Sequence, residues 1–471
     1  MFRKFFSPKH KYKTSLTIFG FILSLMIILS FNPEKTLSQD INLSSPERYK
    51  MAANLTVSEK VMKMEQRLEK EFEVYFDRHL SEVSKTGNDI AQKLLEISQK
   101  SNIRPAVFWA IPESEYLHLV FISPGKKPLV QDISSIERET LIRTVKSFHS
   151  EITNPKTLFT DSYLNLAQQL YQLIVKPFAA NLQAEEIDTI LFCLGKGLRT
   201  LPIAALHDGN QFLVEKYSLA IIPAFNLIDS NYTPIEKGRI LAMGASEFPT
   251  QSPLPAVPVE LSIIVDENLM ENISTQNLSG GWPGKLFLNQ DFTLENLKNQ
   301  LSSQSFNIIH LATHADFQPG KPENSYIQFE DTQLHLDEIK DISWNDPPAE
   351  LLVLSACKTA VGDEDVELGF AGLALQAGVQ SALASLWYVN DIGTLALMSE
   401  FYEQLKTAPT KAETIRQTQI KMIQGDVRLT NNKLKFSRGE ISLPQNLQIL
   451  GETDFSHPFY WSGFTLISSP W

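Results

Sequence analysis

The sequence predicts an α/β fold in which helices flank a mostly parallel β-sheet. Short apolar runs, typical of strands buried in such a sheet, alternate with segments of helical periodicity. The runs lie at 189–194, 218–223, 239–243, 306–315, 351–354, 381–387 and 460–467, and helices are predicted at 162–175, 294–301, 369–379, 394–405 and 412–423. Repeated alternation of strands and helices favours a layered sandwich with the sheet at its centre.

The N-terminal part of the chain has a different predicted order of helices and strands. A long amphipathic helix is predicted over 57–79 and a second helix over 89–98, followed by a hairpin whose strands are 106–111 and 117–123. The edge of this hairpin could extend the main sheet. We therefore divide the chain into a leader (1–38), a linker (39–54), a helix and hairpin region (55–150) and a larger α/β domain (151–471).

Composition narrows the class of protein. The chain has 471 residues, 43% of them hydrophobic, 20% charged, and a net charge of -12. These proportions are ordinary for folded domains. The acidic balance argues against nucleic acid as the main partner, because phosphate binding needs clustered lysine and arginine.

The leader has the layout of an export signal. Residues 1–38 contain six basic residues and one acidic residue, and 15–31 is an uncharged, strongly apolar stretch. A stretch of this length lies between a signal-peptide core and a full membrane span. Two outcomes stay open: an anchor that holds the body on the non-cytoplasmic side, or a cleaved signal that leaves a secreted or periplasmic protein. In either case residues 15–31 are the predicted membrane contact.

Two cysteines are present, which excludes a disulfide framework. Cys193 lies inside an apolar run and is interpreted as a small buried hydrophobe. Cys357 is placed where the apolar run 351–354 ends, and His314 ends the run that begins at 306. If the two strands are parallel neighbours, thiol and imidazole lie together at the edge where ligands bind in such sheets.

Two other patterns have simpler interpretations. His310 precedes His314 by four residues, a spacing also used by zinc sites, but no third ligand accompanies the pair, so His310 is interpreted as a hydrogen-bonded core residue. The acidic run 363–367 is interpreted as a solvated turn. No cofactor and no metal are expected.

Several motifs together resemble the CHAT family, a caspase-like domain related to caspases, separases and gingipains. They are His310-Leu-Ala-Thr-His314, Leu354-Ser-Ala-Cys-Lys-Thr-Ala360, Glu367-Leu-Gly-Phe-Ala-Gly-Leu-Ala374, Ser385-Leu-Trp387 and His457-Pro-Phe-Tyr-Trp461. The resemblance covers about 155–470. It implies a caspase-like three-layer sandwich and a cysteine endopeptidase that cleaves peptide or protein substrates.

The resemblance also implies roles for individual residues. Cys357 would be the nucleophile and His314 the general acid and base, with an oxyanion hole formed by the backbone N–H groups of Cys357 and Ala315. Asp391 could line a pocket that selects a basic side chain, or it could be a surface carboxylate or helix cap before Thr394.

Ala315 departs from the family pattern, which continues His-Gly. An alanine still supplies an N–H donor, but its methyl group would interfere if the position needed a positive φ or a very close approach of substrate. The alternative function is therefore an impaired pseudopeptidase that acts as a protein-interaction or signalling scaffold.

Overall fold

The computed structural model describes residues 55–81, 83–232, 238–266, 280–344, 348–359, 363–448 and 452–471, except for the side chains of 356–359. The predicted leader and linker lie outside these residues. Residues from Leu55 to Trp471 form one compact unit. Within the described ranges, no helix combines the length and the apolar character needed to cross a bilayer.

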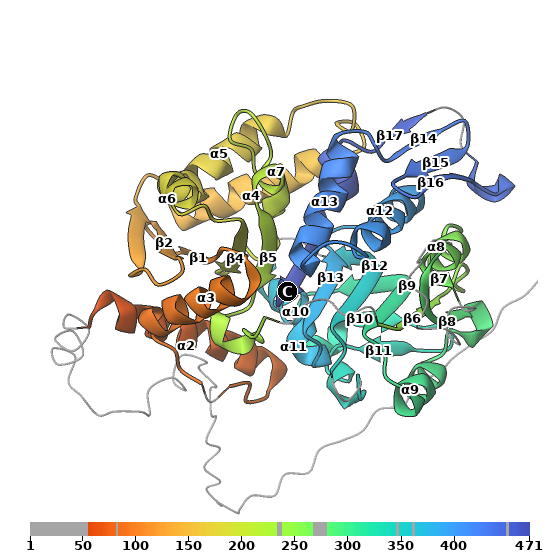
Figure 1. The fold of residues 1–471 in the computed structure, drawn as a ribbon, viewed down its shortest axis with the longest axis horizontal. Coiled ribbons are helices and arrows are strands. Elements are labelled where there is room, and N and C mark those ends of the chain that lie inside the picture. Colours follow the sequence, from red (N-terminus) through yellow and green to blue (C-terminus); the bar gives the residue numbers. More distant parts are fainter. Residues whose placement is uncertain are drawn as a thin grey trace, which may run out of the picture. The chain divides into compact units, whose positions relative to one another are not determined.

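A 14-stranded sheet runs through the whole unit (Figure 1). In spatial order its main path is β3 (Leu129–Ile133), β2 (Leu117–Ile122), β1 (Pro105–Pro112), β4 (Thr189–Leu194), β5 (Ser218–Ile222), β18 (Phe464–Ser468), β13 (Ser381–Ser385), β12 (Leu351–Thr359), β9 (Ile308–Phe317), β6 (Ile240–Gly244), β8 (Trp282–Leu288) and β7 (Val265–Asp266). The short strand β10 (Tyr326–Gln328) pairs with β9, and β11 (Gln333–His335) pairs with β10, both in antiparallel orientation. Strands β1, β4, β5 and β18 are mutually parallel, as are β13, β12, β9, β6, β8 and β7, and the two groups meet at the antiparallel pair β13–β18.

Helices cover both faces of the sheet, so the predicted fold class, an α/β sandwich with a mostly parallel central sheet, is confirmed. One layer holds α4 (Arg138–Thr153), α5 (Leu164–Ile174), α6 (Ala179–Ala184), α7 (Leu213–Lys216), α12 (Asp391–Gln404) and α13 (Lys411–Ile423). The other holds α2 (Val57–Phe76), α3 (Gly87–Ser101), α10 (Glu364–Ala371) and α11 (Leu373–Ala377) (Figure 1). The remaining helices are α8 (Val257–Ile264), α9 (Leu294–Ser303) and α14 (Pro458–Trp461).

The N-terminal region is part of the same sheet. The predicted hairpin is present as β1 and β2, and β1 pairs in parallel with β4, so the hairpin extends the main sheet as expected. Helix α2 begins at a capping box in which the side chain of Thr56 accepts from the N–H of Glu59 and the carboxylate of Glu59 accepts from Thr56. Sequence analysis missed β3 and α4, which follow the hairpin.

Buried polar contacts fix α2 to the sheet. Glu65 on α2 is fully buried and accepts from the indole Nε1–H of Trp109 at 2.7 Å and from the backbone N–H of Asn226 at 3.0 Å. Burial raises the pKa of Glu65 to about 7. A carboxylate held in this way requires both donors, so α2 has one defined position on β1.

Small residues let α2 approach the segment after Cys357. A side chain at Gly372 would overlap the ring of Phe76, and one at Gly369 would come within 3.0 Å of the hydroxyl of Tyr75. The Gly- and Ala-rich run 369–379 therefore allows close packing, as predicted, but against helix α2.

Three expectations about the C-terminal half need correction. The predicted helix 369–379 is two short helices, α10 and α11, separated at Gly372. The predicted acidic turn is wrong, because Asp363 caps α10 and 364–367 form its first turn, where carboxylates are favoured by the helix dipole. The segment 428–454 forms a separate four-stranded sheet of β14 (Arg428–Thr430), β15 (Lys433–Phe436), β16 (Gly439–Ser442) and β17 (Thr453–Asp454), which was not predicted.

Candidate active site

The backbones of His314 and Cys357 lie on neighbouring strands. Strands β9 and β12 are parallel, with Ala356 in register with His314 and Cys357 in register with Ala315. His314 and Cys357 are therefore one register step from each other. Their strands, like other neighbouring strands in a sheet, are about 4.8 Å apart. Strand β12 continues through Cys357 to Thr359, two residues further than predicted.

A register irregularity lies directly before these residues. Between the pairs Leu354–Leu311 and Ala356–His314, β9 advances by three residues while β12 advances by two. An extra residue of this kind re-aims the side chains that follow it and is common next to functional sites. His314 is therefore presented by a locally distorted strand end.

Among the described residues, the ring of His314 has one hydrogen-bond partner, the backbone carbonyl of Ser252, at 2.8 Å from Nε2. A carbonyl can only accept, so Nε2 carries the proton, and in the neutral imidazole Nδ1 is the acceptor. Burial lowers the pKa of His314 below its usual 6.5, although the Ser252 carbonyl and Asp316 act in the opposite direction. At neutral pH the ring is thus an uncharged base.

Aromatic side chains flank this imidazole. The ring of Phe248 meets it edge-on, with 4.8 Å between centroids, and the ring of Tyr388 lies at 6.2 Å. Tyr388 is 38% exposed and follows the end of β13. Together with the Ser252 carbonyl, these rings limit how far His314 can turn.

Asp391 lies in the same neighbourhood. It is the first residue of α12, and its Oδ2 accepts from the backbone N–H of Ala256 at 2.5 Å. Burial, and after it the nearby Glu260, raise the pKa of Asp391 to about 7, and burial followed by the charge of Asp391 raises the pKa of Tyr388. The cap of α12 is Asn390, whose side chain accepts from the N–H of Gly393, so Asp391 is not the helix cap.

Ala315 has an ordinary backbone and a buried side chain. It lies within β9, in register with Cys357 on one side and Ile327 on the other, and its φ is not positive. Its side chain is 2% exposed and belongs to the hydrophobic core.

His310 is a structural residue. It is fully buried, with Nε2 at 2.9 Å from Oε1 of Glu260 and Nδ1 at 3.0 Å from the hydroxyl of Tyr402. Both ring nitrogens are thus occupied, in agreement with the prediction of a hydrogen-bonded core histidine. Cys193 is also buried, as predicted, and its thiol donates to the carbonyl of Pro223. Burial raises the pKa of this thiol, which makes it unreactive.

Sequence analysis missed the residues that surround His314. Ser252 and Phe248 belong to the segment before α8 that reads only as a Pro- and Ser-rich loop. The one sequence feature that could have pointed to this segment is its position after the strand at 239–243, because loops at the carboxyl ends of parallel strands often bind ligands.

The comparisons with known proteins point to one family. A family model described as CHAT domain matches residues 164–469. A search of curated proteins gave no match. Among solved structures, the chain is similar to the Saccharomyces cerevisiae separase–securin complex, with 11% sequence identity, 81% of this chain and 31% of that chain covered, and a TM-score of 0.47. It is also similar to the complex of the pro- and mature domains of RgpB from Porphyromonas gingivalis, with 8% identity, 70% and 76% coverage, and a TM-score of 0.37. The chain thus spans about a third of the length of the separase chain.

Proposed function

The chain belongs to the CHAT domain family, with a caspase-like cysteine peptidase fold, and on this premise we propose that it is an endopeptidase with a Cys357/His314 dyad. The observation that carries the proposal is that β9 and β12 are adjacent parallel strands, so that the backbones of His314 and Cys357 lie one register step apart at the same end of the sheet. The neutral state of the imidazole supports it further, because only an uncharged ring can take a proton from the thiol.

The proposed reaction has two stages. Nδ1 of His314 takes the proton of the Cys357 thiol, and the thiolate attacks the carbonyl carbon of the scissile peptide bond. The C–N bond then breaks as His314 returns the proton to the leaving amine, which leaves a thioester. Water, deprotonated by the same nitrogen, hydrolyses the thioester and restores the thiol. The N–H groups of Cys357 and Ala315 would bind the oxyanion, each contributing about 3 kcal/mol.

In this mechanism the Ser252 carbonyl is a positioning group. Its bond to Nε2–H favours the tautomer in which Nδ1 is free to act as the base. A backbone carbonyl cannot change its protonation state, so it holds the ring without competing for the transferred proton.

The position of the Ala315 side chain supports activity. The methyl group is buried in the core and the backbone has no positive φ, so neither reason for requiring glycine applies at this position. The departure from the family pattern is therefore no argument against activity.

We propose that Asp391 selects a basic side chain of the substrate. Its carboxyl is partly buried, has only one hydrogen-bond donor among the described residues, and lies beside Tyr388, whose ring is close to His314. With a pKa of about 7, the carboxyl would ionise fully on pairing with a lysine or arginine side chain.

One observation favours a second candidate, the catalytically impaired scaffold. Strand β12 remains paired with β9 beyond Cys357, as far as Thr359 opposite Phe317. A nucleophile held inside a strand ladder must be released before substrate can bind. If no signal releases it, the protein would act only through its interactions with other proteins.

Labelling with a peptidyl acyloxymethyl ketone that carries arginine next to the reactive group separates the two candidates. Endopeptidase activity predicts labelling that is lost in Cys357→Ala and reduced about 10²- to 10⁴-fold in His314→Ala. Matched controls are Cys193→Ser for the thiol and His335→Ala, a half-buried histidine like His314, for the imidazole. Labelling that survives loss of His314, with no cleavage of any peptide in a library, would favour the scaffold.

We also propose that the leader places the body across a membrane or exports it. The support is the basic and apolar pattern of residues 1–38. Fractionation of cells that express the full chain, beside a variant lacking residues 1–38, tests the proposal. Equal distribution of both forms would contradict it.

A further inference from the structure

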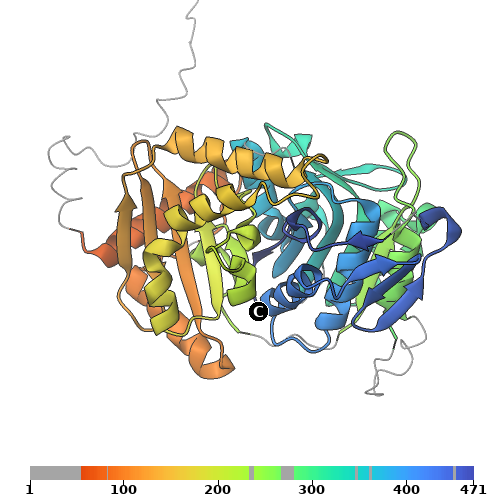
Figure 2. The same cartoon turned by 90° about the horizontal axis from the view of Figure 1, so that it is seen from above.

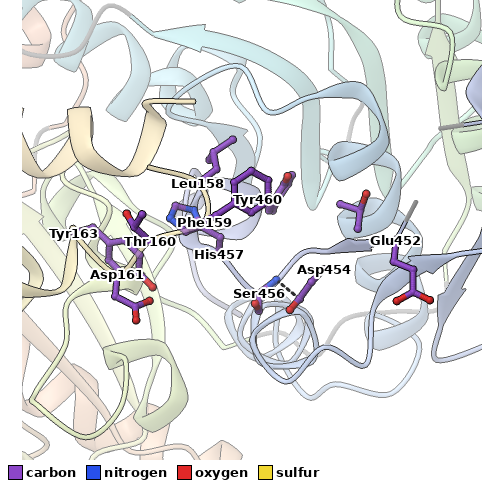
Figure 3. Close-up of a pocket in the computed structure, with 11 residues that line it drawn as sticks. Leu158, Phe159, Thr160, Asp161, Tyr163, Glu452, Asp454, Ser456, His457 and Tyr460 are labelled. Atoms are coloured by element: carbon purple, nitrogen blue, oxygen red, sulfur yellow. Dashed lines mark hydrogen bonds between the residues drawn. The ribbon is translucent and has the colours of Figure 1, made fainter. Parts of the chain in front are cut away.

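Strand β3 is an open edge of the central sheet. Within the described part of the chain it pairs only with β2, in an antiparallel ladder from Leu117–Ile133 to Phe121–Leu129. In Figure 2 the strands of the N-terminal hairpin form the left margin of the unit. Every second residue of such a strand turns its N–H and C=O groups away from its neighbour, so β3 presents hydrogen-bonding groups to another strand.

The side chains at this edge are apolar. Leu129 is 38% and Val130 is 44% exposed, although the β2 residues opposite them, Phe121 and Val120, are buried. Val57, at the start of α2, is also 44% exposed. It lies near β3, because Gly87 is close both to Ser58, which follows Val57, and to Pro128, which precedes β3. These residues account for three of the seven large apolar side chains that are exposed in the described part of the chain. Exposed apolar groups beside an unpaired strand indicate an interface.

Charges at the two ends of β3 indicate what pairs with it. Lys126 and Lys127 are exposed just before the strand, and Asp132 near its end has 55% of its side chain exposed while its Oδ1 contacts Nδ1 of His118 at 2.6 Å. An antiparallel copy of the same segment would bring the basic end of one strand beside the acidic end of the other, twice by symmetry. A strand that is complementary to itself fits a second copy of the chain.

We propose that two copies of this protein associate through antiparallel pairing of their β3 strands, which joins the two sheets into one. A two-fold axis perpendicular to the sheet keeps each side chain on the same face of the sheet in both copies. Because side chains alternate between the two faces along a strand, the residue numbers of two opposing residues must differ by an even number. The pairing that opposes unlike charges has Leu129 opposite Leu129 of the second copy and Lys126 opposite Asp132 of the second copy. Opposite charges across strands stabilise this register over its neighbours.

The interface is small. The paired segment 126–132, of which only 129–132 are strand, buries together with Val57 less surface than the roughly 1,200–2,000 Å² of a stable specific complex. The dimer is therefore concentration-dependent and dissociates on dilution, as weak interfaces do.

Disulfide trapping tests the register. In the full-length chain carrying Cys357→Ser, a Leu129→Cys substitution would place two thiols opposite each other across the axis, within the distance at which a disulfide forms. Mild oxidation should then give a covalent dimer on a non-reducing gel. The matched control is Val74→Cys, which is 67% exposed on α2. Absence of the dimer, or equal cross-linking of both variants, would overturn the proposal.

Sedimentation velocity over a series of concentrations provides a second measurement. Val130→Lys should raise the dissociation constant of the dimer at least about tenfold, because a charge on an open edge opposes pairing. Val74→Lys, with the same change of charge, should leave the constant within about twofold. A wild-type chain that stays monomeric at the highest concentration, or equal effects of both variants, would contradict dimerisation through β3.

Discussion

Replacing Ala315 by glycine restores the residue of the family pattern, and the structure predicts that this change lowers stability without raising activity. The methyl group of Ala315 is 2% exposed in the core, and its backbone is extended, with no positive φ. Loss of one buried methyl group costs about 0.8 kcal/mol, and glycine in a strand costs about 0.5–1 kcal/mol relative to alanine. The variant should therefore lose about 1–2 kcal/mol of unfolding free energy.

Two measurements check this prediction. Thermal unfolding of Ala315→Gly should show a Tm lowered by about 1–2 °C, and labelling by the peptidyl ketone should stay within about twofold of wild type. The matched control is Ala312→Gly, another fully buried alanine of β9. It should show a similar loss of stability. A rise in labelling of tenfold or more in Ala315→Gly, absent from the control, would refute the reasoning, because it would mean that the methyl group obstructs binding of the peptidyl ketone beside His314.

Three further predictions follow from the buried ionisable groups. Because His314 must be uncharged to act and its pKa lies below 6.5, the labelling rate should rise with pH and reach half of its plateau below pH 6.5; a midpoint above that value would contradict the proposed role. The pKa of Asp391 is raised to about 7 from an unfolded value near 3.8, so this carboxyl destabilises the fold as pH rises through that window. Asp391→Asn should therefore raise the Tm at pH 8 but not at pH 4, and reduce labelling by the arginine probe at least tenfold relative to a probe with a neutral residue. Finally, Glu65→Ala leaves the donors of Trp109 and Asn226 without an acceptor and should lower the unfolding free energy by about 2–4 kcal/mol. Glu65→Gln keeps one acceptor oxygen and should lose less unfolding free energy. Equal losses for the two variants in chemical denaturation would contradict this account.

The strands of the central sheet could be predicted because each is a short apolar run between polar turns. What the sequence does not reveal is their spatial order. The antiparallel contact of β13 with β18 joins two groups of parallel strands, and it depends on segments about 80 residues apart. The small sheet of β14–β17 was missed because its strands are short and alternate apolar with charged residues, as in Lys433-Leu-Lys-Phe436.

The candidate site was predictable only in part, for a similar reason. Motifs name His314 and Cys357, and the parallel strands predict that they are neighbours. The partner of the imidazole is a backbone carbonyl, and any residue type at position 252 could supply it. The face on which the Ala315 methyl lies also depends on the register after the irregularity in β9, which no local sequence pattern specifies.

The two histidines of β9 show how depth in the fold separates a structural role from a chemical one. His310 and His314 are four residues apart on the same strand. At His310 the strand runs beneath α8 and α12, so Glu260 and Tyr402 occupy both ring nitrogens and exclude water. Four residues on, the strand emerges toward the edge of the sheet, where one carbonyl fixes His314 and Nδ1 has no partner among the described residues. The same residue type is therefore fixed through both ring nitrogens in the core, whereas at the strand end one ring nitrogen stays open for the proton transfer that the proposed mechanism assigns to His314.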